Sequence, residues 1–193
     1  MNICFATNNA KKLLEIRQLL EPAYRVKSLE EIGCREELPE TGSTLEANSL
    51  QKAQYVWDHY GIACFADDTG LEIEALGGEP GVYSARYAGP ERDNEANIAL
   101  VLQKLEGQPN RKARFRTLIT WIDVHGYRQF EGKVEGEILE QKSGEKGFGY
   151  DPVFRPEGRE CSFAEMSMEE KNAISHRGRA LKKLTDFLRE AAN

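Results

Sequence analysis

Two stretches of strand-like sequence, residues 113–124 and 127–139, are separated only by His125 and Gly126. Stretches of this kind, rich in β-branched and aromatic residues and joined by a short glycine-containing connection, favour an extended β-hairpin. Helical patterns lie on both sides of the hairpin, so strands and helices are mixed along the chain. The sequence therefore predicts an α/β or α+β domain with a long hairpin extension.

The N-terminal third alternates between short apolar strands and amphipathic helices. Strands are predicted over residues 2–6 and 62–66, and each is followed at once by polar residues. Between them, two helices are predicted from apolar positions at helical spacing. The first carries Leu13, Ile16, Leu19 and Leu20 and stops at Pro22; the second begins at Ser43 or Thr44, carries Leu50, Ala53, Trp57 and Tyr60 and ends at Gly61.

The C-terminal part contributes further helices. One is predicted over residues 93–105, with Ile98, Val101, Leu102 and Leu105 directed inward. Ser167 and Glu170 have the spacing of a capping box, which marks the start of a helix. The last helix carries Leu181, Leu184, Leu188 and Ala191 on one face. A loop over residues 143–152, rich in glycine and lysine, separates the hairpin from this region.

Composition excludes several classes of protein. The 193 residues carry a formal net charge of −6, and hydrophobic residues make up 40%. Broad nucleic-acid binding needs clustered basic residues, which an acidic chain does not favour. We therefore expect no nucleic-acid partner, although a small phosphorylated ligand needs only a local basic patch. No apolar run approaches the ~18 residues of a membrane span, so no membrane partner is expected.

The cysteines and the N-terminus together favour a cytoplasmic protein. The N-terminal residues lack the pattern of a signal peptide. Cys4, Cys34, Cys64 and Cys161 are far apart and form no closely spaced pair. Disulfides and a zinc site are therefore not expected, and Cys4 and Cys64 are predicted to be small buried residues.

The first polar cluster, residues 7–12, follows the first predicted strand and begins a helix. It reads Thr7-Asn8-Asn9-Ala10-Lys11-Lys12. Free amide groups and the helix dipole favour an anion at such a position. The sequence is not a standard P-loop, and the alternative is that Asn8 simply caps a helix with solvated lysines.

The second cluster is Asp67-Asp68-Thr69-Gly70, after the strand 62–66. Adjacent carboxylates at a strand end point to different sides. One of them can hold Mg²⁺ beside a polyphosphate or accept a proton from water. The alternative is an acidic turn stabilised by its own hydrogen bonds.

Three further clusters contain chemically useful residues. On the second helix, Asn48 and Lys52 share a face and Glu46 diverges from them, with a solvated polar face as the alternative. Residues 147–152 place Phe148 between two glycines, which suits stacking on a base, although a loop aromatic is more often buried. Residues 171–178 gather Lys171, Ser175 and Arg177 at the predicted start of the last helix, where simple surface charge is the alternative.

The order of these clusters resembles that of the inosine triphosphate pyrophosphatase family. The matching motifs are TNNAKK at 7–12, TLEANSLQKA at 44–53, ADDTGL at 66–71, GVYSARYAG at 81–89, GFGYDPVF at 147–154 and EEKNAISHRGRAL at 169–181. They extend over nearly the whole chain, from the first strand to the last helix.

The resemblance implies an elongated α/β fold with a two-lobed mixed sheet, flanking helices and a long hairpin, so residues 1–193 are expected to form one domain with two lobes. It also implies a homodimer and Mg²⁺-dependent cleavage of non-standard purine nucleoside triphosphates (ITP, dITP, XTP) to the monophosphate and pyrophosphate. A pyrophosphatase for modified pyrimidine nucleotides and a non-catalytic nucleotide sensor are the alternatives.

The resemblance also implies roles for individual residues. Asp68 is expected to be the proton acceptor and a metal ligand. The residues expected to bind substrate are Thr7, Asn8, Asn9, Ala10, Lys11, Lys12, Lys52, Thr69, Phe148, Gly149, Tyr150, Asp151, Lys171, His176 and Arg177. Many relatives place a metal-linked Glu directly before the Asn of the second motif, where this chain has Ala47. Glu46, one residue earlier and turned by ~100° on a helix, is the metal candidate here.

Overall fold

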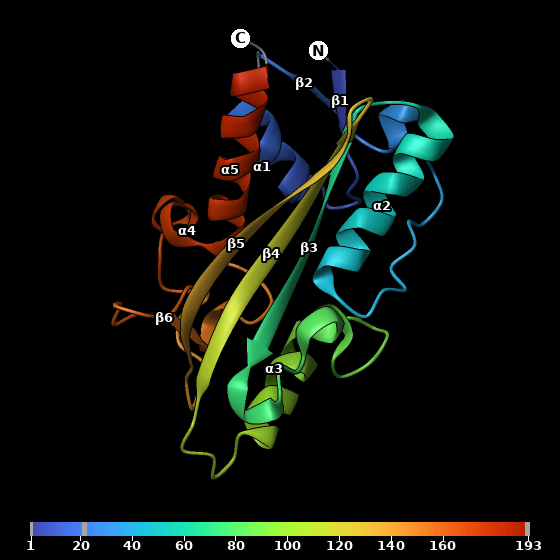
Figure 1. The fold of residues 1–193 in the computed structure, drawn as a ribbon. Helices are drawn as coiled ribbons and strands as arrows, with labels where there is room; N and C mark the ends of the chain where they lie inside the picture. Colours follow the sequence, from blue (N-terminus) through green and yellow to red (C-terminus); the bar gives the residue numbers. More distant parts are fainter. Residues whose placement is uncertain (1, 21–22, 192–193) are drawn as a thin grey trace. The chain divides into compact units, whose positions relative to one another are not determined.

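A computed structural model describes residues 2–20 and 23–191. Six strands form one sheet in the order β2-β1-β3-β4-β5-β6 (Figure 1). The strands are β1 (Asn2–Phe5), β2 (Arg25–Lys27), β3 (Cys64–Ile73), β4 (Lys112–Asp123), β5 (Gly126–Ile138) and β6 (Phe154–Pro156). The helices are α1 (Ala10–Leu20), α2 (Leu45–Tyr60), α3 (Asn94–Lys104), α4 (Met168–Ile174) and α5 (His176–Ala191). This mixed α/β sheet with flanking helices confirms the predicted fold class.

The long hairpin is confirmed as β4 and β5, which are neighbours in the sheet. Its turn is formed by Val124 and His125, one residue earlier than predicted, because Gly126 already belongs to β5.

The strand that carries Asp67 and Asp68 differs more from its predicted extent. β3 does not end at residue 66 but continues through Asp67 and Asp68 to Ile73. The two carboxylates therefore lie inside a strand and not at its end.

The chain divides into two compact units, and the boundary crosses β3, β4, β5 and α5. The first unit comprises residues 1–68, 118–130 and 181–193; the second comprises residues 69–117 and 131–180. Asp68 is the last residue of its segment in the first unit, and Thr69 begins the second. Each unit has its own group of buried apolar side chains.

In the first unit, α2 packs against the parallel strands β1 and β3. Thr44 caps α2 by accepting a hydrogen bond from the Ala47 amide, and Gly61 ends the helix with φ +58°. Both boundaries were predicted. The buried face differs from the predicted one, because Val56 is fully buried while Trp57 is only partly buried. Cys4 and Cys64 are buried in this core, as predicted.

Burial of α1 follows the predicted pattern where its side chains are described. Ile16 and Leu20 are buried. The side chain of Leu19 and the whole of Pro22 lie outside the part of the chain that the structure describes. The cap at the start of α1 is Asn9 and not Asn8, since the Asn9 side-chain oxygen accepts a hydrogen bond from the Lys12 amide at 3.2 Å.

In the second unit, α3 covers one face of the sheet. Asp93 caps α3, and the predicted positions Ile98, Val101 and Leu105 are buried against the sheet residues Leu71 and Phe115. The strands β2 and β6, with three residues each, were not predicted, because a three-residue strand shows no repeating pattern.

Residues 171–178 were predicted to lie at the start of the last helix. The structure instead divides them between two helices, α4 and α5. The capping box of Ser167 and Glu170 begins α4, as predicted. Ser175 then takes an extended conformation and ends α4. Lys171 therefore lies on α4 and His176 begins α5. The predicted inward residues Leu181, Leu184 and Leu188 of α5 are buried, and the side chain of Ala191 lies outside the described set.

The start of α5 lies directly against β5 because Gly132 has no side chain. A Cβ at this position would lie 1.9 Å from the carbonyl oxygen of His176 and 2.5 Å from the amide nitrogen of Ala180. These are backbone atoms, so they cannot move aside as a flexible side chain would. Gly132 thereby fixes the position of His176 and Arg177 within the second unit.

We expect Gly132→Ala to lower the free energy of unfolding by about 3 kcal/mol, the upper end of the cost of overpacking. The control is Gly107→Ala, where no atom lies within 4 Å of the added Cβ and the positive φ of +72° is the source of strain. That control should cost about 1–2 kcal/mol. Chemical unfolding measures both. A smaller loss for Gly132→Ala than for Gly107→Ala would contradict the assigned role.

Candidate functional site

The first group of candidate residues surrounds Asp67 and Asp68 in the middle of β3, within the first unit. Successive residues of a strand point to opposite faces, so the two carboxylates diverge. Asp67 is buried and its Oδ2 lies 2.7 Å from Lys12 Nζ. Asp68 is partly buried and interacts with Lys52 and Asn48 of α2. Asp67 pairs with Lys12 and Asp68 interacts with Lys52, so each acid has a lysine near it.

Lys52 connects the loop before α2 with strand β3. Its Nζ lies 2.5 Å from Glu40 Oε1 and 2.7 Å from the backbone carbonyl oxygen of Asp67. Burial lowers the pKa of Lys52, but attraction to Asp67, Asp68 and Glu40 outweighs burial, so its pKa is raised overall. Lys52 is therefore a buried permanent cation. Asn48 is buried on the same face of α2, as the i, i+4 spacing predicted.

Asp68 has the titration behaviour of a base that works near neutral pH. Burial raises the pKa of Asp68 to about 6, and Glu40 and Asp67 act in the same direction. Lys52 and a hydrogen bond from Asn48 act in the opposite direction. A carboxyl group with this pKa is ionised at pH 7 and still basic enough to accept a proton from water.

Glu40 is an acidic member of the cluster that the sequence analysis missed. It lies in the loop before α2, and the loop is held in place by a hydrogen bond from the Gly42 amide to Asn48 Oδ1 at 2.7 Å. A Cβ on Gly42 would lie 2.8 Å from the same oxygen. No motif pointed to Glu40, because its partner Lys52 is 12 residues away and the loop between them has no periodic pattern.

A divalent cation suits the charge distribution around Asp68. Glu40, Asp67 and Asp68 bring three carboxylates to two lysines, Lys12 and Lys52, so acidic groups outnumber basic ones in this cluster. Within residues 2–20 and 23–191, no group of three or more His, Cys, Asp or Glu side chains is arranged as a metal site. Mg²⁺ does not need such a group, because one or two carboxylates, waters and substrate phosphates suffice.

Glu46 lies in the first turn of α2, where it was predicted to act as a metal ligand. Its backbone carbonyl accepts hydrogen bonds from Gln129 Nε2 at 2.9 Å and from Ser49 Oγ at 3.3 Å. These contacts fix the backbone of α2 and leave the role of the Glu46 carboxylate a prediction. Glu40 is the acid that the structure couples to Asp68.

The N-terminus of α1 lies in the same unit as the acid pair. Thr7 Oγ1 accepts a hydrogen bond from the Asn9 amide at 3.2 Å, and Asn9 caps the helix. Asn8 and Ala10 are exposed there. Lys12 extends from the first turn to Asp67, so the predicted anion-binding segment and the acid pair are brought together. The side chain of Lys11 lies outside the described set.

The second group of candidate residues surrounds Phe148 in the second unit. Gly147 and Gly149 have φ values of +76° and +60°, which bend the loop at both sides of Phe148. Phe148 is 49% exposed, so of the two alternatives that the sequence allowed, the structure favours the exposed ring over the buried one. Asp151 closes the loop by accepting a hydrogen bond from the Phe148 amide at 2.9 Å. A Cβ on Gly147 would lie 2.1 Å from the same carboxylate, so the turn requires glycine.

Two cations lie against the Phe148 ring. Lys171 Nζ is 4.9 Å from the ring centroid and Arg177 Cζ is 5.5 Å from it. Lys171 also forms a buried ion pair with Asp151 at 2.5 Å. An exposed aromatic ring with adjacent cationic donors can stack on a base and donate hydrogen bonds to its edge.

His176, Tyr150 and Thr69 occupy more enclosed positions in this unit. His176 is buried, and its ring stacks on Phe115 with centroids 4.7 Å apart. Tyr150 is buried and donates a hydrogen bond to the Ser84 carbonyl at 2.7 Å. The Thr69 hydroxyl lies 2.7 Å from that of Thr117. Contact of these three residues with substrate remains a prediction.

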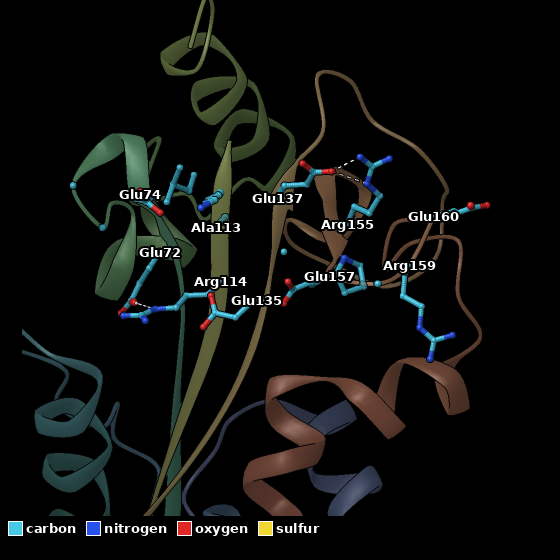
Figure 2. Close-up of a pocket in the computed structure, with 17 residues that line it drawn as sticks. Glu72, Glu74, Ala113, Arg114, Glu135, Glu137, Arg155, Glu157, Arg159 and Glu160 are labelled. Atoms are coloured by element: carbon cyan, nitrogen blue, oxygen red, sulfur yellow. Dashed lines mark hydrogen bonds and ion pairs between the residues drawn. The ribbon is translucent and has the colours of Figure 1, made fainter. Parts of the chain in front are cut away.

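A groove of about 1010 Å³ lies elsewhere in the second unit, on the charged face of the sheet (Figure 2). None of the residues predicted from the sequence lines it. Its charges compensate one another: Arg114 Nε lies 2.7 Å from Glu72, and Arg155 Nε lies 2.8 Å from Glu137. Paired surface charges of this kind do not indicate a ligand, so we assign the groove no function.

We expect Asp68→Asn to stabilise the protein more at pH 8 than at pH 5. The folded-state pKa of Asp68 is raised from its ordinary value of 3.8 to about 6, so the wild-type protein loses stability as pH rises through this range. Asn carries no charge and escapes this loss, which is on the order of 3 kcal/mol at pH 8, with roughly half of it already present at pH 5. Melting curves of both proteins should show a gap in melting temperature about twice as large at pH 8 as at pH 5. An equal gap at both pH values would contradict the raised pKa.

Comparison with known proteins gives matches over nearly the whole chain. A dITP/XTP pyrophosphatase of Porphyromonas gingivalis is 56% identical over 187 residues, which is 96% of each chain. The protein of the same name from Bacillus subtilis is 49% identical and covers 95% of this chain and 94% of its own length.

Solved structures and a family profile agree with these matches. The Ham1 protein of Staphylococcus aureus has a TM-score of 0.95 and 39% identity, covering 99% of this chain and 100% of its own. A nucleoside-triphosphatase or dITP/XTP pyrophosphatase of Mycobacterium abscessus has a TM-score of 0.83 and 43% identity, covering 95% and 98%. The profile of the Ham1 family matches residues 3–187. The resemblance inferred from the motifs is therefore confirmed, and the chain belongs to the Ham1 family.

Proposed function

We propose that this protein hydrolyses non-standard purine nucleoside triphosphates (ITP, dITP and XTP) to the nucleoside monophosphate and pyrophosphate. The observation that carries the proposal is Asp68, a carboxylate with a raised pKa between a buried lysine and two further acids. The names of the similar proteins, dITP/XTP pyrophosphatase, support the same activity. The reaction removes altered purines from the nucleotide pool.

In the proposed reaction, Asp68 accepts a proton from the water that attacks the α-phosphorus. A new P–O bond forms to that water as the bond between the α-phosphorus and the bridging oxygen breaks. Pyrophosphate leaves with the bridging oxygen. The amides at the start of α1, together with Lys12 and Lys52, bind the phosphate oxygens and compensate their charge. Little covalent chemistry is required of the protein, because positioning and charge compensation supply most of the catalysis.

Mg²⁺ is the proposed cofactor, held by Asp68 and Glu40. Glu46, one residue before the position at which many relatives place a metal-linked Glu, is a further candidate ligand. When bound, it would supply positive charge to the phosphate oxygens. The presence of three carboxylates beside two lysines around Asp68 supports a cation there.

Base selectivity is assigned to the residues around Phe148. The exposed ring stacks on the purine, and Lys171 and Arg177 supply hydrogen-bond donors for a 6-oxo group. Adenine presents an amino donor at that position, and two opposed donors leave both groups without a partner. This contrast supports ITP and XTP as substrates in preference to ATP.

We further propose that the protein acts in the cytoplasm and as a homodimer. No helix in the described part of the chain is long and apolar enough to span a membrane.

The function is tested by incubating the purified protein with Mg²⁺ and either ITP, dITP, XTP, ATP or GTP, and by measuring monophosphate and pyrophosphate. Modified pyrimidine triphosphates in the same assay examine the alternative substrate class. We expect pyrophosphate release from the three non-standard purines, and a loss of at least 100-fold in kcat for Asp68→Asn. Release of orthophosphate, or equal turnover of ATP and ITP, would contradict the proposal. Binding of ITP without hydrolysis would support a non-catalytic sensor instead.

We expect Phe148→Ala to raise KM for XTP by about 5- to 100-fold and to change kcat little, because stacking on an aromatic ring contributes about 1–3 kcal/mol per base. The matched control is Tyr127→Ala, which removes an equally exposed aromatic ring (57% exposed) in β5. Steady-state kinetics with XTP compare the two. An unchanged KM in Phe148→Ala would show that the ring does not bind the base.

A further inference from the structure

The motif at residues 81–89 has no part in the proposed chemistry, yet it is closely attached to the second half of β3. The Ile73 amide donates a hydrogen bond to the Glu79 carbonyl at 3.0 Å, and Glu72 bridges to Pro80. The Leu71 amide donates to Ser84 Oγ at 2.9 Å. The chain after β3 thus folds back along this part of the strand, and the Ser84 hydroxyl takes the place of a carbonyl from a neighbouring strand.

Ser84 also reaches the loop that carries Phe148. Its carbonyl oxygen accepts a hydrogen bond from the Tyr150 hydroxyl at 2.7 Å. Its hydroxyl donates to the Gly81 carbonyl at 2.6 Å, so the side chain is oriented on both sides. Ser84 is 8% exposed and Tyr150 is 5% exposed. Ser84 therefore connects Leu71 of β3, which lies two residues after Thr69, with the loop 147–151.

The buried position of Tyr150 decides what this residue can do. Its ring packs in the apolar core of the second unit beside Phe154 and Val153. Two residues earlier in the chain, the Phe148 ring is half-exposed. Tyr150 thus holds one end of the loop in the core, and the Asp151–Lys171 ion pair holds the same end from α4.

We propose that Tyr150 and Ser84 are positioning residues for base recognition, and that Tyr150 acts through the loop without touching the nucleotide. Their hydrogen bond, the Ser84–Tyr150 contact, fixes the loop 147–151 and with it the orientation of the Phe148 ring. This inference rests on the proposed function, because it assigns the contact a role in choosing the base. It gives the motif at 81–89 a part in specificity.

The test compares two buried tyrosines that make the same kind of hydrogen bond. Tyr150→Phe removes the Ser84–Tyr150 contact and keeps the ring. Tyr24→Phe is the matched control. The hydroxyl of buried Tyr24 donates a hydrogen bond to the Leu188 carbonyl, and both of these residues lie in the first unit, whereas Tyr150 and Ser84 lie in the second. We measure kcat and KM for XTP and ATP, and the inhibition constant of pyrophosphate, a product that has no base.

For Tyr150→Phe we expect KM for XTP to rise about 3- to 10-fold, the effect of one neutral hydrogen bond. We expect kcat and the inhibition constant of pyrophosphate to stay within 2-fold, and the preference for XTP over ATP to fall. Tyr24→Phe should leave all four quantities unchanged. Ser84→Ala removes the hydrogen bond from the Leu71 amide, and we expect it to raise KM for XTP in the same way by about 2- to 5-fold.

Three outcomes overturn the inference while the proposed function stands. The first is an unchanged KM for XTP in both Tyr150→Phe and Ser84→Ala. The second is a joint rise of KM for XTP and the inhibition constant of pyrophosphate in Tyr150→Phe, and the third is a rise of KM in Tyr24→Phe as large as that in Tyr150→Phe. The second and third would indicate a general loss of structure. If the wild-type protein releases no pyrophosphate from XTP, dITP or ITP, the proposed function itself fails. Ser84→Ala keeps the test decisive if Tyr150→Phe does not fold.

Discussion

The burial of two adjacent carboxylates inside strand β3 is the constraint on which the candidate site depends. Carboxylates are seldom buried without compensation, because the loss of hydration is costly. Lys12 from α1 compensates Asp67, and Lys52 from α2 lies among Asp67, Asp68 and Glu40. The helices α1 and α2 are thus tied by charge to one point of the sheet. Burial keeps the pKa of Asp68 raised, although Lys52 acts in the opposite direction.

Local patterns predicted most of the fold. The hairpin, the caps at Thr44 and Ser167 and the inward faces of α3 and α5 depend on residues close together in the chain, so they could be read from the sequence. The extension of β3 through Asp67 and Asp68 could not, because polar residues normally end a strand and only the lysines of two helices allow them here. The break at Ser175 was missed for a similar reason, since Ser is acceptable within a helix.

The candidate site shows the same division. Asp68 and Phe148 were found from short motifs, whereas Glu40 was missed because its importance arises from contact with Lys52 across a loop without a pattern. Burial could not be predicted from the sequence either. Tyr150 and His176 belong to binding motifs by resemblance, but the structure buries Tyr150 in the apolar core and stacks the buried His176 ring on Phe115. Composition and spacing do not tell which residue of a motif points outward.

The division of the chain into two compact units has an evolutionary consequence. The acids and lysines proposed to cleave the anhydride all belong to the first unit, and the loop proposed to choose the base belongs to the second. A substitution around Phe148 therefore falls in a different compact unit from Asp67, Asp68 and Lys52. Selection can retune which damaged nucleotide is accepted, one loop residue at a time, while the hydrolytic residues remain the same. A single ancestral chemistry can in this way serve a succession of altered bases.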